Sequence, residues 1–134
     1  MRPELNGSCV KSFSKHANQH NKALSVALKK LQSRLPGFKY SIVYYYHALA
    51  NRIKNPTKYV GEVICCGSGL DNGRNCGGGS NGTQTYNLCS NRNDYVLFGG
   101  HHTQKTNQQL AQLFWSGAPN VIGPYNVKQF FEFV

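Results

Sequence analysis

The chain has 134 residues, a formal net charge of +10 and 40% hydrophobic residues, which indicates one domain with a modest core. An aromatic content of 12% argues against wholesale disorder. No stretch approaches the roughly 18 consecutive apolar residues of a membrane-spanning helix, and Met1 to Gly7 lacks the apolar run of a secretory signal peptide.

The basic residues gather in the first half of the chain. Residues 5 to 61 contain ten of them and no Asp or Glu, a balance typical of proteins that bind nucleic acids or anionic surfaces. A single-strand binder places stacking aromatic side chains between its lysines, and the helix face described next has none there. We therefore rank a small basic nucleic-acid-binding protein last and expect no nucleic-acid partner.

A helical pattern runs from about Ser14 to Leu35. Counted at 100° per residue, four leucines fall within an arc of about 60° and three lysines lie on the opposite side. The pattern predicts an amphipathic helix whose leucine face joins the core, and Pro36-Gly37 ends it. The leucines are Leu24, Leu28, Leu31 and Leu35, and the lysines are Lys15, Lys22 and Lys29.

A strand is predicted next, over Lys39 to Tyr46, because β-branched and aromatic residues follow one another there. Its nearly continuous apolar character suits a sheet that is covered on both faces. A short helix from about His47 to Lys54 follows and is stopped by Asn55-Pro56. The succession of helix, strand and helix favours an α/β layout with parallel strands.

The segment 67–93 differs in kind from the rest, since it holds seven of the 14 glycines and six asparagines. We expect a long loop with little regular structure there. Such a loop is unusual in a compact domain unless it is tied down, and the cysteines within and beside it would do so as disulfides. The five cysteines, with candidate glycosylation sequons at Asn6 and Asn81, point to an oxidising, secretory environment.

The remaining predicted elements are a strand at Tyr95 to Phe98, a turn at Gly99 to His102 and a helix from about Thr103 to Trp115. The tail contains Val121-Ile122 and ends in the aromatic run 130–133, which we expect to pack back on the body. The two histidines of the turn thus follow a strand and precede a helix, where an α/β sheet presents its catalytic loops.

The sequence gives little support to three common kinds of site. The cysteines and histidines lack the paired knuckle spacing of structural zinc sites, so no metal is expected. The glycine-rich runs do not match a phosphate-binding loop, and no cofactor is expected. No serine lies in a G-x-S-x-G elbow. His101 and His102 remain as the candidate catalytic residues.

Ten short motifs follow one another along the chain: His20-Asn21, Leu35 to Tyr40, Tyr44 to Tyr46, Asn55-Pro56, Tyr59 to Gly67, Cys76-Gly77, Leu88-Cys89, Tyr95 to His102, Trp115 to Gly117 and Val121 to Pro124. This series resembles the C-terminal portion of a plant GDSL esterase/lipase, of the SGNH hydrolase superfamily. The likeness is strongest to the crucifer myrosinase-associated and inactive GDSL esterase/lipase-like branch, and it covers residues from about 9 to 134.

The resemblance implies a three-layer α/β/α fold around a parallel sheet, of which residues 1–134 would form one partial domain. It also implies a catalytic apparatus in which a Ser nucleophile lies in a Gly-Asp-Ser motif and a Gly and an Asn complete the oxyanion hole. A C-terminal Asp-x-x-His supplies the His that takes the Ser proton. This chain contains no Gly-Asp-Ser and matches the region downstream of it, so the nucleophile and oxyanion-hole residues have no counterparts here.

The Asp-x-x-His block is altered as well. Family members have approximately Phe-Asp-Gly-x-His-Asn-Thr-Glu-Lys, whereas the corresponding segment 98–105 is one residue shorter. If the Asp was deleted, His101 matches the catalytic His; if the deletion falls after the His, Gly99 replaces the Asp and His102 matches. We favour His101, because that alignment preserves Gly99-Gly100 and Thr103. The Asp is absent under either alignment.

The resemblance also bears on the cysteines. A cysteine upstream of this region would pair with Cys9, and the other four would pair among themselves in one of three ways: Cys65, Cys66, Cys76 and Cys89. We therefore predict a truncated GDSL esterase/lipase-like protein of the carboxylic ester hydrolase class that is inactive alone, with an ester substrate only if active. The alternative is a non-enzymatic interaction protein with a partner in the secretory pathway. By resemblance, the protein is secreted or resides in the endomembrane system or vacuole.

Overall fold

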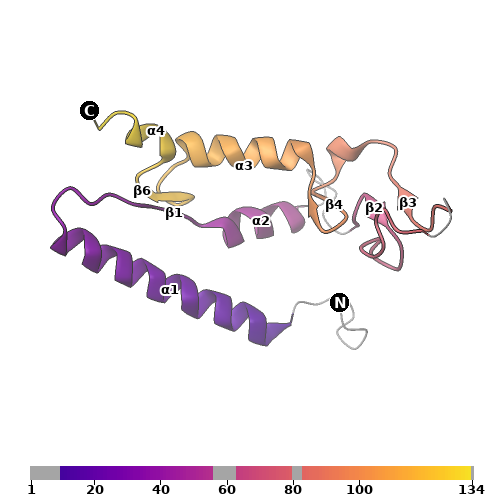
Figure 1. Cartoon of the computed structure of the whole chain (residues 1–134), viewed down its shortest axis with the longest axis horizontal. Helices are drawn as coiled ribbons and strands as arrows, with labels where there is room; N and C mark the ends of the chain where they lie inside the picture. The colour runs from indigo at the N-terminus through magenta and orange to yellow at the C-terminus, as the bar shows by residue number, and fades with distance from the viewer. Residues whose placement is uncertain (1–9, 56–62, 80–82, 134) are drawn as a thin grey trace.

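The computed structural model describes residues 10–55, 63–79 and 83–133. Helices and very short strands, connected by loops, form this part of the chain, as Figure 1 shows. In chain order the elements are α1 (Lys11–Arg34), β1 (Ser41–Val43), α2 (Tyr45–Ile53), β2 (Cys66–Gly67), β3 (Asn87–Leu88), the 3-10 turn η2 (Arg92–Asp94), β4 (Leu97–Phe98), β5 (His101–His102), α3 (Gln104–Ser116), β6 (Ile122–Pro124) and α4 (Val127–Phe130).

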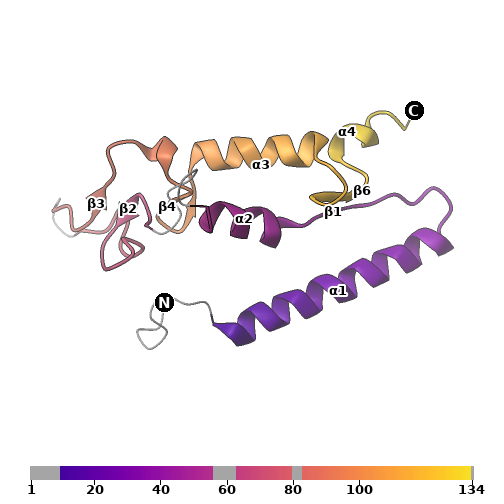
Figure 2. The ribbon, with the colours of Figure 1, turned by 180° about the vertical axis from the view of Figure 1, so that it is seen from behind.

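The elements form an elongated arrangement in which β1, β6 and α2 lie between two helices. Figures 1 and 2 both show α3 along one side of this strip and α1 along the other. The loops around β2 and β3 occupy one end, and α4 lies at the opposite end. Because α1 lies at the margin, only one of its sides faces the rest of the chain.

The strands in the described residues form three separate antiparallel pairs, β1 with β6, β2 with β3 and β4 with β5. The prediction of parallel strands is wrong for these pairs, although a mixture of helices and strands is present as expected. A parallel pair requires a crossover of a dozen or more residues, whereas strands joined by a tight turn pair antiparallel. Only two residues, Gly99 and Gly100, separate β4 from β5.

The strand predicted over Lys39 to Tyr46 is shorter than expected, since β1 contains only three residues. Its partner β6 pairs Pro124 with Ser41 and Ile122 with Val43, and a proline has no N–H to extend the ladder at its own position. Beyond Val43 the chain begins α2 at Tyr45. The tyrosines that suggested a strand therefore lie at a helix start, where tertiary context overrides their strand propensity.

The helices agree more closely with the sequence. The helix predicted for Ser14 to Leu35 is confirmed as α1, and the helix predicted from about Thr103 is confirmed as α3, with Thr103 as its N-cap. The short helix after the first strand is confirmed as α2, which begins two residues earlier than expected. In the part of the chain that the structure describes, no helix has both the length and the apolarity to cross a membrane.

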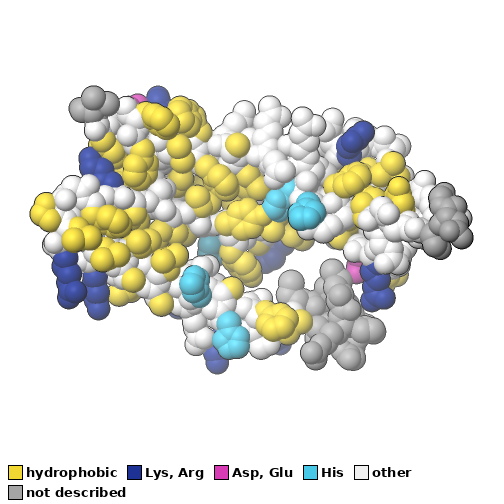
Figure 3. All heavy atoms as spheres, in the orientation of Figure 1, with side chains coloured by type: hydrophobic (Ala, Val, Ile, Leu, Met, Phe, Trp, Pro, Cys, Tyr) yellow, Lys and Arg dark blue, Asp and Glu magenta, His cyan; other side chains and the backbone are white. Residues whose placement is uncertain are grey.

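Few apolar side chains are buried. Among the described residues the buried hydrophobic set is Cys65, Cys66, Val96, Leu110 and Ile122. Figure 3 correspondingly shows hydrophobic side chains spread across the surface of the face that it presents. The leucine face of α1 was predicted to join the core, and this is wrong for the described residues: α1 buries none of its side chains, and Leu24 and Leu31 are 39% and 41% exposed.

The aromatic tail packs back on the body, as predicted. Tyr125 and Phe133 meet edge to face with ring centroids 4.8 Å apart, and the Lys39 ammonium lies 3.2 Å from the centre of the Phe133 ring. Trp115, on α3, contacts Phe131 at 5.6 Å between centroids. These contacts attach the C-terminus to α3 and to the residue that precedes β1 by two positions, through aromatic and cation–π interactions.

Candidate functional site

The histidine pair lies in a tight hairpin. Phe98 of β4 pairs with His101 of β5, and Leu97 pairs with His102, so Gly99 and Gly100 form a two-residue loop. The loop needs glycine at its first position, because Gly99 has φ of +58° and a Cβ there would lie 3.0 Å from the Cβ and 3.1 Å from the Sγ of Cys76. The hairpin therefore sits directly on the side chain of a disulfide-bonded cysteine.

The two histidines have different surroundings, because successive side chains of a strand point to opposite faces. His102 is half-buried, and its Nε2 lies 2.7 Å from the Tyr45 hydroxyl on α2. The two rings are inclined at 60° with centroids 5.7 Å apart. His101 is exposed, and its side chain makes no hydrogen bond to any other residue that the structure describes.

No carboxylate supports either imidazole within residues 10–55, 63–79 and 83–133. Glu132 is at the far end of the chain, where it forms an exposed ion pair with Lys128 at 3.7 Å. Asp94 belongs to η2 and makes no side-chain bond to a histidine. A catalytic histidine that moves a proton needs an acid to hold its tautomer and to stabilise its charged form. In the described residues the only side chain that hydrogen-bonds to either ring is the Tyr45 phenol.

The junction between β5 and α3 is fixed by two buried threonines. The Thr103 hydroxyl donates to the Tyr95 carbonyl at 2.8 Å and accepts from the Thr106 backbone N–H at 3.3 Å, while the Thr103 N–H donates to the Val96 carbonyl at 3.0 Å. An N-cap of this kind stabilises a helix by about 1 kcal/mol. The cap holds the start of α3 against the two residues that precede β4, and so sets where the histidines lie.

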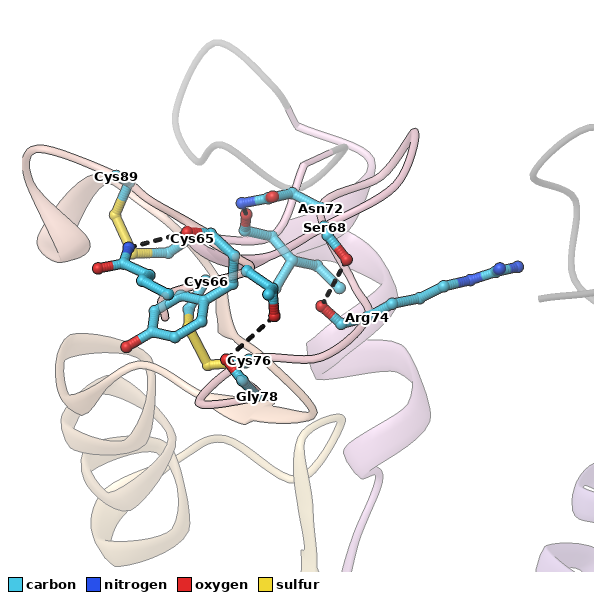
Figure 4. The surroundings of a disulfide bond; sticks show 12 residues. Cys65, Cys66, Ser68, Asn72, Arg74, Cys76, Gly78 and Cys89 are labelled. Atoms are coloured by element: carbon cyan, nitrogen blue, oxygen red, sulfur yellow. Dashed lines mark hydrogen bonds between the residues drawn. A yellow bond between two sulfur atoms is a disulfide. The ribbon is translucent and has the colours of Figure 1, made fainter. Parts of the chain in front are cut away.

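The disulfides supply the other support, and Figure 4 shows both. Cys65 bonds Cys89 and Cys66 bonds Cys76, which is one of the three pairings that the sequence left open. The Cys65 N–H also donates to the Leu97 carbonyl at 3.0 Å, and the Cys89 N–H donates to the Cys65 carbonyl at 2.8 Å. The glycine-rich segment is thus tied to Cys65 and Cys66 by the two disulfides, and Cys65 is tied to β4 by a hydrogen bond, as the predicted tied-down loop requires.

A cavity of about 710 Å³ lies between α2 and the residues around α3 and β6. Arg52 is buried in its wall, where its guanidinium donates to the Ala48 carbonyl at 2.8 Å and to the Gln109 amide oxygen at 3.4 Å. Neither the cavity nor the buried arginine was predicted. The sequence signal that could have indicated Arg52 is its place four residues after Ala48 and three after Leu49, on the apolar side of the predicted helix. The lining contains no acid: Tyr44, His47, Ala48, Asn51, Arg52, Asn55, Leu113, Asn120 and Val121.

Three residues singled out by the sequence, Cys9, Asn6 and Asn81, lie outside the described residues. The described part of the chain contains no group of three or more His, Cys, Asp or Glu side chains placed to hold a metal ion. His101 and His102 are therefore the candidate site residues that the structure locates, with Tyr45 as a contact that was not predicted.

Comparison with known proteins gives the family. The chain is 45% identical over 131 residues to GDSL esterase/lipase 4 of Arabidopsis thaliana, which covers 94% of this chain and 35% of that protein. It is 38% identical over 125 residues to Inactive GDSL esterase/lipase-like protein 25 of Arabidopsis thaliana, covering 90% of this chain and 28% of that protein. It is 36% identical over 138 residues to GDSL lipase of Tanacetum cinerariifolium, covering 98% of this chain and 37% of that protein.

Two of these relatives are named as a GDSL esterase/lipase or lipase, and the third is named as an inactive GDSL esterase/lipase-like protein. The chain belongs to the plant GDSL esterase/lipase family and matches its C-terminal portion. It spans about a third of the length of the curated relatives it matches, 35% in the case of GDSL esterase/lipase 4. No family model matches the chain, and no solved structure matches it significantly.

Proposed function

We propose that this chain is a segment of a GDSL esterase/lipase-like protein of the carboxylic ester hydrolase class, and that the 134 residues do not hydrolyse esters on their own. One of His101 and His102 is the remnant general base of the family's catalytic apparatus. An ester is the substrate only in an assembly that supplies the nucleophile and the oxyanion hole.

The observation that carries this proposal is that no carboxylate of the described residues contacts either histidine of the β4–β5 hairpin. In a Ser-His-Asp mechanism the carboxylate orients the imidazole and stabilises the imidazolium that forms. The partner of His102 is instead the Tyr45 hydroxyl, at 2.7 Å from Nε2. Loss of the acid alone lowers turnover on the order of 10⁴-fold, and the 134 residues also contain no Gly-Asp-Ser to supply the nucleophile.

The direct test is hydrolysis of short p-nitrophenyl esters by the purified chain. We expect no release of p-nitrophenol above that of the chain with both histidines replaced by alanine. Turnover by the unmodified chain that His101→Ala or His102→Ala abolishes would overturn the proposal. Thermal unfolding of each variant, followed by circular dichroism, controls for loss of structure.

A non-enzymatic interaction protein is the second candidate, and the exposed apolar side chains favour it. Large hydrophobic residues at 40% exposure or more occur on α1, at the start of α2 and in the C-terminal tail, including Leu31, Tyr46 and Phe131. Contiguous exposed apolar surface marks sites of association. Co-purification of the tagged chain from plant extract tests this candidate, and recovery of no specific partner counts against it.

The compartment and the complete fold belong to the same proposal. Two disulfides support an oxidising compartment, which agrees with a secreted, endomembrane or vacuolar protein. The three-layer α/β/α fold with a parallel sheet is proposed for the complete family domain, of which this segment would form one part. Free cysteine thiols in protein purified from plant tissue would contradict the proposed oxidising compartment.

A further inference from the structure

One side of α1 forms an apolar stripe that the described residues leave largely exposed. At 100° per residue the stripe lies within an arc of about 60°, and it runs for most of the helix and one residue past its end. Leu28 is half-buried, and the other members are 39% to 70% exposed. We define the stripe by five residues: Phe13, Leu24, Leu28, Leu31 and Leu35.

The side of α1 that faces the body is polar. A hollow of about 200 Å³ separates α1 from β1 and α2, and the side chains that α1 contributes to its wall are Asn18, Asn21, Lys22 and Ser25. These positions are turned by roughly 50° to 150° from the centre of the stripe. The stripe therefore lies on a side of α1 that is turned away from this hollow, and four of its five side chains are at least 39% exposed.

An amphipathic helix normally buries its apolar face, and a stripe of this length in water marks an association surface. The relatives indicate the occupant. The chain spans 35% of GDSL esterase/lipase 4 at 45% identity, so about two thirds of that protein's length has no counterpart among these 134 residues. That remainder is long enough to supply an apolar surface for a helix with this pattern, and the described residues cover its stripe only in part.

We propose that the stripe is the docking surface for the complementing segment, by which we mean the part of a GDSL esterase/lipase chain outside the matched third. The inference rests on the proposed function only through the family assignment and requires no turnover. A second copy of this chain is less well suited, because stripe-to-stripe packing covers α1 alone. The exposed tyrosines Tyr44 and Tyr46, beside β1, would remain uncovered, whereas a segment twice as long can cover both.

The experiment mixes the purified 134-residue chain with the separately produced complementing segment of GDSL esterase/lipase 4 and measures their affinity by fluorescence anisotropy. The test variant is Leu24→Glu/Leu31→Glu, which places two carboxylates in the stripe. Because an unpaired charge is costly to bury, we expect binding at least about 100-fold weaker, or roughly tenfold for each carboxylate.

The matched control is Val26→Glu. Val26 is 56% exposed on the same helix and lies about 200° from Leu24, on the side away from the stripe. It receives the same kind of change, from an exposed apolar side chain to a carboxylate, and we expect its affinity to stay within about twofold of the unmodified chain. Far-UV circular dichroism confirms that all chains keep their helix content.

Amide hydrogen exchange on the unmodified chain gives a second readout that no substitution can disturb, and binding is expected to slow exchange along α1. Absence of binding, unchanged exchange in α1, or equal weakening by both variants would overturn the proposal. Self-association of the chain alone, lost in Leu24→Glu/Leu31→Glu, would also overturn it in favour of a homodimer. Ester hydrolysis by the 134-residue chain alone would refute the proposed function and leave the docking surface standing, so the two proposals can fail separately.

Discussion

The two disulfides should stabilise the chain to different extents, because they close loops of different length. Cys65 and Cys89 are 24 residues apart, and Cys66 and Cys76, which lie between them, are 10 apart. In the chain-entropy treatment the inner bridge shortens the effective outer loop to about 15 residues. Removal of the outer bridge then costs about 3 kcal/mol of unfolding free energy, and removal of the inner bridge about 2.3 kcal/mol.

The difference of about 0.8 kcal/mol depends only on the two loop lengths, so it is the sharper quantity to measure. Each bridge has one cysteine that is at most 1% exposed, Cys65 in one and Cys66 in the other, so each variant loses one fully buried sulfur. The variants are Cys65→Ala/Cys89→Ala and Cys66→Ala/Cys76→Ala, both with Cys9→Ser to prevent thiol exchange.

Urea unfolding followed through the fluorescence of the single tryptophan and through far-UV circular dichroism gives both free energies. We expect the outer-bridge variant to be the less stable of the two at equal m-values. An inner-bridge variant that is as unstable as the outer one, or more so, would refute the loop-entropy reasoning. It would mean that the contact between Cys76 and Gly99 in the hairpin outweighs chain entropy.

Two further predictions concern the hairpin. Gly99→Ala should lower the unfolding free energy by about 1–3 kcal/mol, because φ is positive there and the new Cβ meets Cys76. Gly100→Ala is the control, since its Cβ would have no atom within 4 Å, and it should change the unfolding free energy by less than about 0.5 kcal/mol. Urea unfolding of both variants measures the two losses, and equal losses would contradict the prediction. In a chimera that joins the complementing segment of GDSL esterase/lipase 4 to this chain, an Asp inserted between Phe98 and Gly99 should raise kcat toward p-nitrophenyl esters by about 10³–10⁴-fold through His101. The competing change Gly99→Asp acts through His102 instead, so rescue by Gly99→Asp that His102→Ala removes would reverse our choice of histidine.

The helices could be predicted because their signals are local. Leucine spacing and Pro36-Gly37 define α1 within a few residues, and the threonine before α3 is a common N-cap. The strand over residues 39–46 failed because pairing depends on the partner. Only the three residues of β6 pair with it, and that limit is set more than 75 positions away in the sequence.

In the candidate site, too, features set by neighbouring residues were predicted and features set by distant residues were not. The hairpin histidines were found from their order between a strand and a helix, but Tyr45 was not, because 57 residues separate it from His102. Burial of the α1 leucines was predicted from amphipathicity, which specifies that a face needs cover and not what covers it. Which cysteines pair was equally beyond reach, since spacing alone leaves three connectivities.

The described residues fall into a part that is stabilised by its own disulfides and hydrogen bonds and a part, α1, that has few stabilising contacts within the chain. The histidine hairpin is anchored by Cys66–Cys76, by the Cys65 hydrogen bond to Leu97 and by the Thr103 cap, all within residues 65–106. Helix α1 has no buried side chain and no disulfide in the described residues. Disruption of the stripe should therefore leave the hairpin intact, so that association and the state of the histidines can be tested independently in the same chain.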